Sequence, residues 1–434
     1  MSARRILMTA DTVGGVWTYA LELAAGLGEH GVEVALATMG APLTPQQREA
    51  SGQIPNLEVF ESCFKLEWME DPWEDVSKAG EWLLQLEGRL QPDIVHLNGY
   101  VHAALPWQTP TLVVGHSCVL SWWEAVKGEA APASWDRYRE EVRRGLQAAN
   151  LVIAPSAAML AELNAHYGGL VNGRVIPNGR DSSIFCPLEK KEFVLTAGRL
   201  WDEAKNVAAL EDIAPQLLWP IYIAGEEEHP DRRRGGEGER GRGGESARGR
   251  KISILGCEDS LMASNGSIAP KFTQAEQTKI CVERRSVLPY ANSRRSLDLS
   301  TGFSPPHPLT PSPPHLLGLL STEELASWYA HASIYALPAR YEPFGLSVLE
   351  AALSGCALVL GDIASLREIW GDAAMFVPPD DGNAIAYAIN TLIKDSSLRT
   401  AFAAKARTRA LEFTPQRMVA GYLEAYQDLI AQRL

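Results

Sequence analysis

The stretch "RYEPFGLSVLEAALSGCALVL", residues 340–360, contains the pattern on which the assignment of the fold rests. Its apolar residues recur at the spacing of an amphipathic helix, which we expect from about Gly345 to Ser354. Gly355 then supplies the left-handed residue that commonly ends a helix. On this helix Glu350 falls opposite the apolar side chains, so we expect it to point away from the core.

Two carboxylates therefore flank a helix start that should attract anions. The N–H groups of Phe344, Gly345 and Leu346 have no acceptor within the helix, which makes them an anion site. Glu342 and Glu350 fit beside an anion that also carries sugars, because one carboxylate accepts hydrogen bonds from both hydroxyls of a diol. For Glu350 a second interpretation stays open, a solvated first-turn side chain favoured by the helix dipole.

Cations for such an anion are present in "AGRLWDEAKN", residues 197–206. Arg199 directly follows an apolar strand and Lys205 lies near the next helix start, where a guanidinium and an ammonium can both contact phosphate oxygens. An ordinary pair of surface cations is the alternative. Gly14 and Gly15, at an early strand-to-helix turn, give a weak phosphate-loop signal that falls short of GxGxxG.

The remaining chain alternates short apolar strands with amphipathic helices, which predicts an α/β fold of doubly wound parallel sheets. The pattern begins at "RRILMTA" and restarts at "KEFVLTAGRL", so two such domains are expected. We place the first at residues 1–185 and the second at residues 186–230 and 313–412. The last segment, residues 413–434, reads as one amphipathic helix that packs back toward the first domain.

Residues 231–312 interrupt the second domain with Arg/Gly/Glu-rich and Pro/Ser-rich sequence that has no apolar period. This composition favours a disordered insertion over an RNA-binding arm. The strand-helix pattern stops before the segment and resumes after it, and its two ends look complementary at codon level. We therefore interpret it as a foreign insertion, such as a translated repeat element, that could compromise activity.

Composition excludes several classes of protein. The formal net charge of −13 argues against nucleic acid as a main partner. No stretch approaches the roughly 20 apolar residues of a membrane span, so stable membrane insertion is not expected. The N-terminus reads as a first strand and not as a signal peptide, which predicts a cytoplasmic protein.

Taken together, "GRLWDEAKN", "RYEPFGLSVLEAALSGCALVLGD", "IPNGRDSSIF" and "DTVGGV" resemble the family 4 glycosyltransferases of the GT-B fold. The resemblance covers residues 1 to about 229 and 315 to 434. It implies two Rossmann-like domains that face a cleft. It also implies a retaining hexosyltransferase that takes its sugar from a nucleotide-diphosphate donor, bound mostly by the C-terminal domain.

The resemblance also assigns roles to the donor-side residues. Glu342 matches the glutamate that contacts the donor sugar and its anomeric region, and Glu350 matches the one that holds the ribose diol. Arg199 and Lys205 match the pair that neutralises the diphosphate leaving group, so no metal site and no cofactor are expected. Retention in this family is usually explained by attack from the face of the leaving group, with a donor phosphate oxygen helping to deprotonate the acceptor.

Further positions follow from the same resemblance. The N–H groups of residues 344–346 match those that face the donor sugar and phosphate, and Gly14 and Gly15 match the loop from the N-terminal domain. His116, in "VVGHS", matches a histidine near the donor sugar, although a strand-end histidine with ordinary partners explains it equally well. The acceptor, a saccharide or a lipid-linked glycan, cannot be read from the sequence.

Other activities stay open as alternatives. One is an insertion-disrupted transferase that keeps only its fold or its nucleotide-sugar binding. Another is a sugar-nucleotide epimerase on the same fold, which would lack the Arg–Lys segment. A phosphorylase would need a lysine-bound cofactor pocket, and a nicotinamide-dependent dehydrogenase would need GxGxxG.

Overall fold

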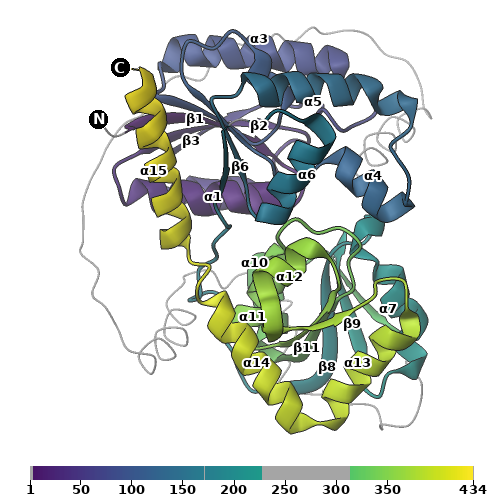
Figure 1. The fold of residues 1–434 in the computed structure, drawn as a ribbon. Coiled ribbons are helices and arrows are strands. Elements are labelled where there is room, and N and C mark those ends of the chain that lie inside the picture. Colours follow the sequence, from purple (N-terminus) through teal and green to yellow (C-terminus); the bar gives the residue numbers. More distant parts are fainter. Residues whose placement is uncertain (1–2, 171, 227–312, 434) are drawn as a thin grey trace, which may run out of the picture. The chain divides into compact units, whose positions relative to one another are not determined.

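The computed structural model describes residues 3–170, 172–226 and 313–433 and contains two parallel sheets with helices on both faces (Figure 1). The predicted α/β architecture of two doubly wound sheets is confirmed. The first sheet ends at Val175 and the second begins at Lys191, on either side of the boundary expected at residue 185. The predicted insertion, residues 231–312, lies outside the described residues.

The first sheet has the strand order β3-β2-β1-β4-β5-β6-β7, with every described pair parallel. Its strands are β1 (Arg5–Asp11), β2 (Glu33–Met39), β3 (Leu57–Glu61), β4 (Ile94–Leu97), β5 (Thr111–Val114), β6 (Leu151–Ala154) and β7 (Gly173–Val175). The helices between them are α1 (Gly15–Gly28), α2 (Pro45–Gly52), α3 (Trp73–Leu90), α4 (Val119–Lys127), α5 (Asp136–Ala148) and α6 (Ala157–Tyr167).

Alternate residues of each strand of this sheet enter two separate cores, as the period of two requires. On β1, Ile6 and Met8 enter the core shared with α1, whereas Leu7 enters the core shared with α3, α5 and α6. Both faces are therefore covered, which explains why the strands read as continuous apolar runs.

The second sheet repeats this topology with the order β10-β9-β8-β11-β12-β13. Its strands are β8 (Lys191–Arg199), β9 (Ile221–Glu226), β10 (His315–Gly318), β11 (Ala332–Leu337), β12 (Ala357–Gly361) and β13 (Met375–Val377). Its helices are α7 (Val207–Ile213), α10 (Thr322–His331), α11 (Leu346–Leu353), α12 (Ala364–Trp370), α13 (Gly382–Lys394) and α14 (Ser396–Ala410). One core packs against α10, α11 and α14, and the other against α7 and α13.

The last helix, α15 (Pro415–Arg433), packs on the first sheet although it follows the second in sequence (Figure 1). Its contact with α1 is close, because a Cβ on Gly26 would lie only 2.5 Å from Val419. The buried ring of His96 on β4 lies 2.7 Å, through Nδ1, from the hydroxyl of Tyr426 on α15. Residues 415–433 therefore complete the core of the first sheet.

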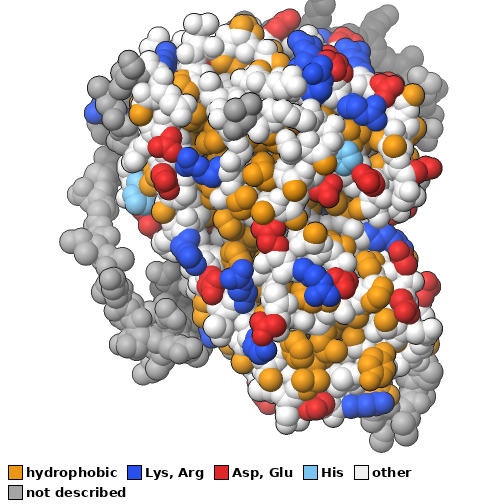
Figure 2. All heavy atoms as spheres, viewed as in Figure 1, with side chains coloured by type: hydrophobic (Ala, Val, Ile, Leu, Met, Phe, Trp, Pro, Cys, Tyr) orange, Lys and Arg blue, Asp and Glu red, His pale blue; other side chains and the backbone are white. Residues whose placement is uncertain are grey.

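The surface mixes charges of both signs. On the face in Figure 2, Lys and Arg side chains alternate with Asp and Glu and do not gather into one basic patch. Within the part of the chain that the structure describes, no helix is both long and apolar enough to cross a bilayer.

Candidate active site

Neighbouring strands β8 and β11 define the point at which the second sheet reverses its winding. Ligands of open α/β sheets bind at the carboxyl ends of such strands. Arg199 is the last residue of β8, and the loop after β11 carries Glu342. The two loops are joined by a hydrogen bond of 2.8 Å from the backbone N–H of Arg340 to the carbonyl of Ala204. Two distant segments therefore meet where a ligand is expected.

Lys205 and Glu342 contact each other directly at this point. Lys205 Nζ lies 2.5 Å from Glu342 Oε2, and the two side chains are only 13% and 12% exposed. From sequence, the lysine was expected to bind phosphate and the glutamate a sugar, as separate contacts. In the structure the two opposite charges instead form an ion pair with each other.

Arg199 lies beside the glycine loop of the first sheet. A Cβ on Gly14 would be 3.5 Å from Arg199 Nη1, an ordinary contact distance, so the guanidinium lies next to this glycine. Arg199 Nη2 also donates to Asp202 at 2.9 Å, and Trp122 Nε1 donates to the same carboxylate at 2.9 Å. Burial acts to raise the pKa of Asp202, but the charges of Arg199 and Lys205 and its hydrogen bonds lower it overall. Asp202 is thus a fixed anion that orients Arg199.

Helix α11 begins one residue later than expected and has Gly345 as its N-cap. Gly345 has a φ of 87°, a left-handed conformation that favours glycine. Because glycine has no side chain to cap the first turn, the N–H groups there are available to an anion. The Phe344 side chain is buried against Phe413, and Leu346 lies next to Gly15, whose Cβ would be 3.4 Å from it. The structure thus brings Gly15 to the start of α11.

Glu350 corrects one expectation. The solvated first-turn interpretation is wrong, because the Glu350 side chain is buried and the residue is only 8% exposed. Its Oε1 lies 2.9 Å from Nε of Arg180. Burial raises the pKa of Glu350, while the Arg180 charge opposes the increase. Helical periodicity placed Glu350 on the correct face of α11 but could not show that a remote segment covers this face.

His116 follows β5 and contacts Asn98, which follows β4. The amide of Asn98 donates from Nδ2 to the carbonyl of Thr9 at 2.7 Å, so its Oδ1 is the acceptor for His116 Nε2 at 2.9 Å. Nε2 then carries the proton and Nδ1 is the acceptor nitrogen. Burial lowers the pKa of His116 to about 3, so the ring is neutral near pH 7. The ring also packs edge-on against Tyr19.

Comparisons with known proteins identify the family. The model of Glycosyltransferase Family 4 matches residues 13–183, and the model of Glycosyl transferases group 1 matches residues 315–409. The chain belongs to the family 4 glycosyltransferases.

Relatives and solved structures agree with this assignment. The D-inositol 3-phosphate glycosyltransferase of Kineococcus radiotolerans is 25% identical, with 97% of this chain and 92% of that protein aligned. The O-antigen chain mannosyltransferase B of Escherichia coli is 34% identical, but only 26% of this chain and 30% of that protein align.

Among solved structures, sucrose-phosphate synthase from Thermosynechococcus elongatus gives a TM-score of 0.69 at 16% identity, with 99% and 100% of the two chains covered. HepE of Anabaena in complex with UDP-glucose gives 0.65 at 16% identity, with 98% and 99% covered. The fold of this glycosyltransferase is GT-B.

The structure adds two carboxylates to the site that the sequence argument missed. Asp11 ends β1, next to the Gly14 loop, and accepts a hydrogen bond from the N–H of Val13 at 2.5 Å. Glu67 accepts from the N–H groups of Tyr100 and Val101. Burial raises the pKa of each carboxyl to about 7. Asp11 could have been found as the polar residue at the end of a buried strand, whereas Glu67 lies in a loop without such a signal.

Arg180 and Glu22 were also missed. Arg180 stands in the quoted motif "IPNGRDSSIF", where only its neighbours suggested a family, and Glu22 lies within a helix with no motif of its own. The contacts of Arg180 with Glu22 and with Glu350 are a product of the tertiary fold.

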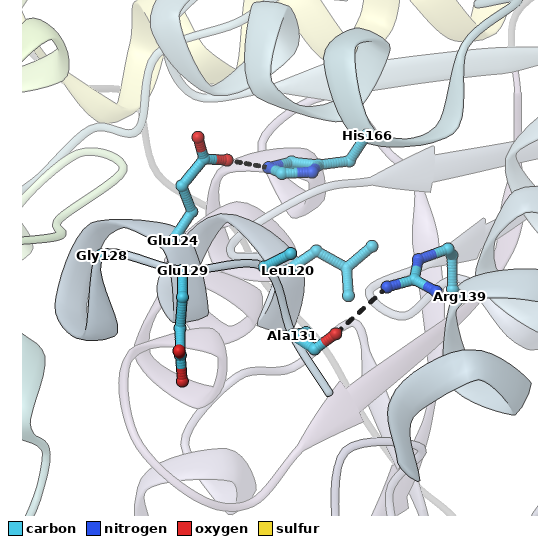
Figure 3. A pocket seen from close by; sticks show the side chains of 8 residues that line it. Leu120, Glu124, Gly128, Glu129, Ala131, Arg139 and His166 are labelled. Carbon is cyan, nitrogen blue, oxygen red and sulfur yellow. Dashed lines mark hydrogen bonds and ion pairs between the residues drawn. The ribbon is translucent and has the colours of Figure 1, made fainter. Parts of the chain in front are cut away.

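A cavity of about 310 Å³ lies among α4, α5 and α6 of this glycosyltransferase, away from all the predicted residues (Figure 3). Two of its polar groups contact neighbours: His166 Nε2 lies 3.5 Å from Glu124, and Arg139 donates to the carbonyl of Ala131. We do not assign the donor to this cavity. Across the described residues, no group of three or more His, Cys, Asp or Glu side chains is arranged to hold a metal ion.

Proposed function

We propose that the protein transfers a hexose from a nucleotide-diphosphate sugar to a saccharide or lipid-linked acceptor, with retention of configuration and without a metal. The observation that carries this proposal is the buried Lys205–Glu342 pair beside Arg199, at the winding reversal of the second sheet. It provides two cations for a diphosphate and a carboxylate for a sugar within one small region.

The donor would contact three features of the second domain. Arg199 and Lys205 bind the diphosphate, the first turn of α11 faces the phosphate and the sugar, and Glu342 accepts hydrogen bonds from the sugar once the phosphate has engaged Lys205. Glu350 accepts the hydroxyls of the ribose. None of these residues falls within the proposed insertion at residues 231–312, which supports an active enzyme over an impaired one.

The chemical step requires stabilisation of a leaving nucleoside diphosphate. As the bond from the anomeric carbon to the phosphate oxygen breaks, the charge that develops is met by Arg199, Lys205 and the N–H groups of α11. The acceptor oxygen attacks from the same face, and its proton passes to the departing phosphate. His116 is neutral and presents Nδ1 as an acceptor, so it orients a sugar hydroxyl and does not supply positive charge.

Names of similar proteins support the class of substrates. The relatives include a mannosyltransferase and a D-inositol 3-phosphate glycosyltransferase, and one similar structure holds UDP-glucose. Two of these names include a hexose, mannose in the transferase and glucose in the bound nucleotide sugar, which supports a hexose donor.

The test is a screen of UDP-, GDP- and ADP-hexoses by thermal shift, followed by measurement of released nucleoside diphosphate with and without mono- and disaccharide acceptors. Release that requires both a donor and an acceptor, with product of the donor's anomeric configuration, supports the proposal. Conversion of the donor sugar without an acceptor would indicate an epimerase instead.

A further inference from the structure

Arg180 stands at a fixed point between the two sheets, in the segment that connects β7 to β8. Its backbone N–H donates to the carbonyl of Phe413 at 3.1 Å. The preceding residue, Gly179, packs so closely that a Cβ there would be 2.3 Å from the carbonyl oxygen of Thr414. The Gly179 N–H also contacts Met418 Sδ at 3.3 Å. The backbone that carries the Arg180 side chain is therefore held in place by residues 413–418.

The guanidinium of Arg180 joins two carboxylates from different domains. Its Nη1 donates to Oε2 of Glu22 on α1 at 2.6 Å, and its Nε lies 2.9 Å from Oε1 of Glu350 on α11. The three side chains are 7%, 13% and 10% exposed, respectively. The guanidinium also lies over the ring of Phe185, with 4.9 Å from Cζ to the ring centroid. The packed guanidinium thus hydrogen-bonds to Glu22 and forms an ion pair with Glu350 at the same time.

This arrangement is poorly suited to stability alone. One guanidinium faces two carboxylates, so the buried group has a net charge of −1, and burying charge is costly. Burial raises the pKa of Glu22 and of Glu350, and the repulsion of Glu350 adds to the effect on Glu22. A single carboxylate would satisfy the arginine at lower cost. The second carboxylate therefore suggests a role outside folding.

The ribose site needs the kind of constraint that Arg180 provides. A glutamate on a helix has several rotatable bonds, and a diol is recognised only when the carboxylate oxygens are held in one orientation. The backbone of α11 fixes the Cα of Glu350, and Arg180 contacts the carboxylate itself. Glu22 in turn holds the other edge of the guanidinium.

We propose that Arg180 is a positioning residue that orients the Glu350 carboxylate toward the ribose diol of the donor, and that Glu22 holds Arg180 in this position. The inference rests on the donor site proposed above. It adds a residue that contacts no substrate, and it makes ribose recognition by the second domain depend on helix α1 of the first.

The experiment measures discrimination between ribose and deoxyribose. Calorimetric titration gives the dissociation constants of UDP, GDP and ADP and of their 2′-deoxy counterparts, and the deoxy-to-ribo ratio for the tightest base is compared among variants. The 2′-deoxy nucleotide lacks one hydroxyl that would donate to the charged Glu350, so we expect a deoxy-to-ribo ratio of about tenfold to a hundredfold in the wild type. We expect Glu350→Gln and Arg180→Met to reduce the ratio to about one to three. Affinity for inorganic pyrophosphate should change little.

Two further variants separate positioning from folding. Arg180→Lys keeps the charge but lacks the fork that contacts both carboxylates, so we expect a folded protein that loses most of the discrimination between ribose and deoxyribose. If Arg180→Met does not fold, Arg180→Lys alone tests the positioning role. Arg174→Met is the matched control, because Arg174 forms a half-exposed ion pair with Asp428 in the same region of the chain. Its ratio should equal that of the wild type.

The outcomes distinguish the two proposals. A wild-type ratio near one would remove the ribose role of Glu350 from the proposed function, and the positioning role of Arg180 with it. A high wild-type ratio that folded Arg180→Met or Arg180→Lys retains in full would overturn the positioning role of Arg180 and leave the donor site intact.

Discussion

The carboxyl ends of the two sheets have the same topology but carry different side chains. In both sheets the winding reverses between two central strands, β1 and β4 in the first and β8 and β11 in the second. At the second sheet the polar groups are ion pairs, such as Lys205–Glu342 and Arg199–Asp202. The first sheet presents Asp11 and His116, which burial shifts toward their neutral forms.

Under the proposed function, the two sheets use the same backbone arrangement to bind two kinds of ligand. Parallel sheets fix where a ligand binds. The side chains at the strand ends decide its chemistry: cations paired with carboxylates suit an anionic donor, and neutral hydrogen-bonding groups suit the hydroxyls of an acceptor. Under the proposed function, the two sheets divide the reaction between leaving group and nucleophile.

Removing a cation from the second sheet should produce the largest effect. We expect Arg199→Ala and Lys205→Ala each to lower sugar transfer by about 100-fold or more, because each removes a fixed charge from the leaving group. Donor-dependent release of nucleoside diphosphate measures this, with and without Mg²⁺ or EDTA, which should make little difference.

Lys127→Ala is the control for these two variants, since Lys127 forms a more exposed ion pair with Glu203 next to the same turn. The double variant Lys205→Met/Glu342→Gln should recover thermal stability lost in Lys205→Ala without recovering activity. Strict dependence on a divalent metal would contradict the assigned role of the two cations.

Substitution of Glu350, on α11, and of Glu342, in the loop before it, should affect different steps. Glu350→Ala is expected to weaken nucleotide binding by about 1.5–3 kcal/mol, because it removes a charged hydrogen-bond acceptor. Glu342→Ala should lower turnover far more than donor affinity. Calorimetry and initial-rate kinetics separate the two effects, and equal small changes from both substitutions would argue against the division of roles.

The buried carboxyl groups beside the first sheet should make the free energy of unfolding depend on pH. Burial raises the pKa of Glu67 from 4.5 to about 7, so the folded state binds a proton that the unfolded state has released. The associated stability is present below pH 4.5 and is lost as the pH rises through 7, with a slope of at most about 1.4 kcal/mol per pH unit.

Glu67→Gln cannot release that proton, and we expect its urea unfolding free energy to vary less than that of the wild type between pH 5 and 8. Glu61→Gln is the control, because the pKa of the more exposed Glu61 is lowered by its hydrogen bond with Arg48. Identical pH profiles for the wild type and Glu67→Gln would show that Glu67 stays ionised.

The smallest effect is expected where α15 meets the first sheet. Tyr426→Phe removes the hydroxyl that contacts His96 Nδ1 and should lower the free energy of unfolding by about 1–2 kcal/mol. Donor affinity should not change, because Tyr426 belongs to the core of the first sheet and not to the ion pairs of the second sheet. A shift in nucleotide affinity as large as that of Glu350→Ala would break the proposed separation of the two regions.

Much of this arrangement could be predicted from the sequence because it depends on local periodicity. Alternating apolar strands and helices predicted both sheets, and the resemblance to the family placed Arg199 and Glu342 at one donor. The burial of Glu350 could not be predicted, because it depends on Arg180, which belongs to another segment of the chain. The direct contact between Lys205 and Glu342 also depends on how two loops pack, which neither loop specifies alone.

The packing of α15 has a consequence for the order of events during synthesis. Domains usually fold as they emerge from the ribosome, beginning with the N-terminal one. Here the core of the first sheet includes Met418, Tyr422 and Tyr426. Residues 3–175 can form their strands early, with α1 on this face, but the part of the core that α15 completes stays open until residues 415–433 have left the ribosomal tunnel. The apolar side chains that pack against α15 therefore stay partly exposed throughout translation of the second domain.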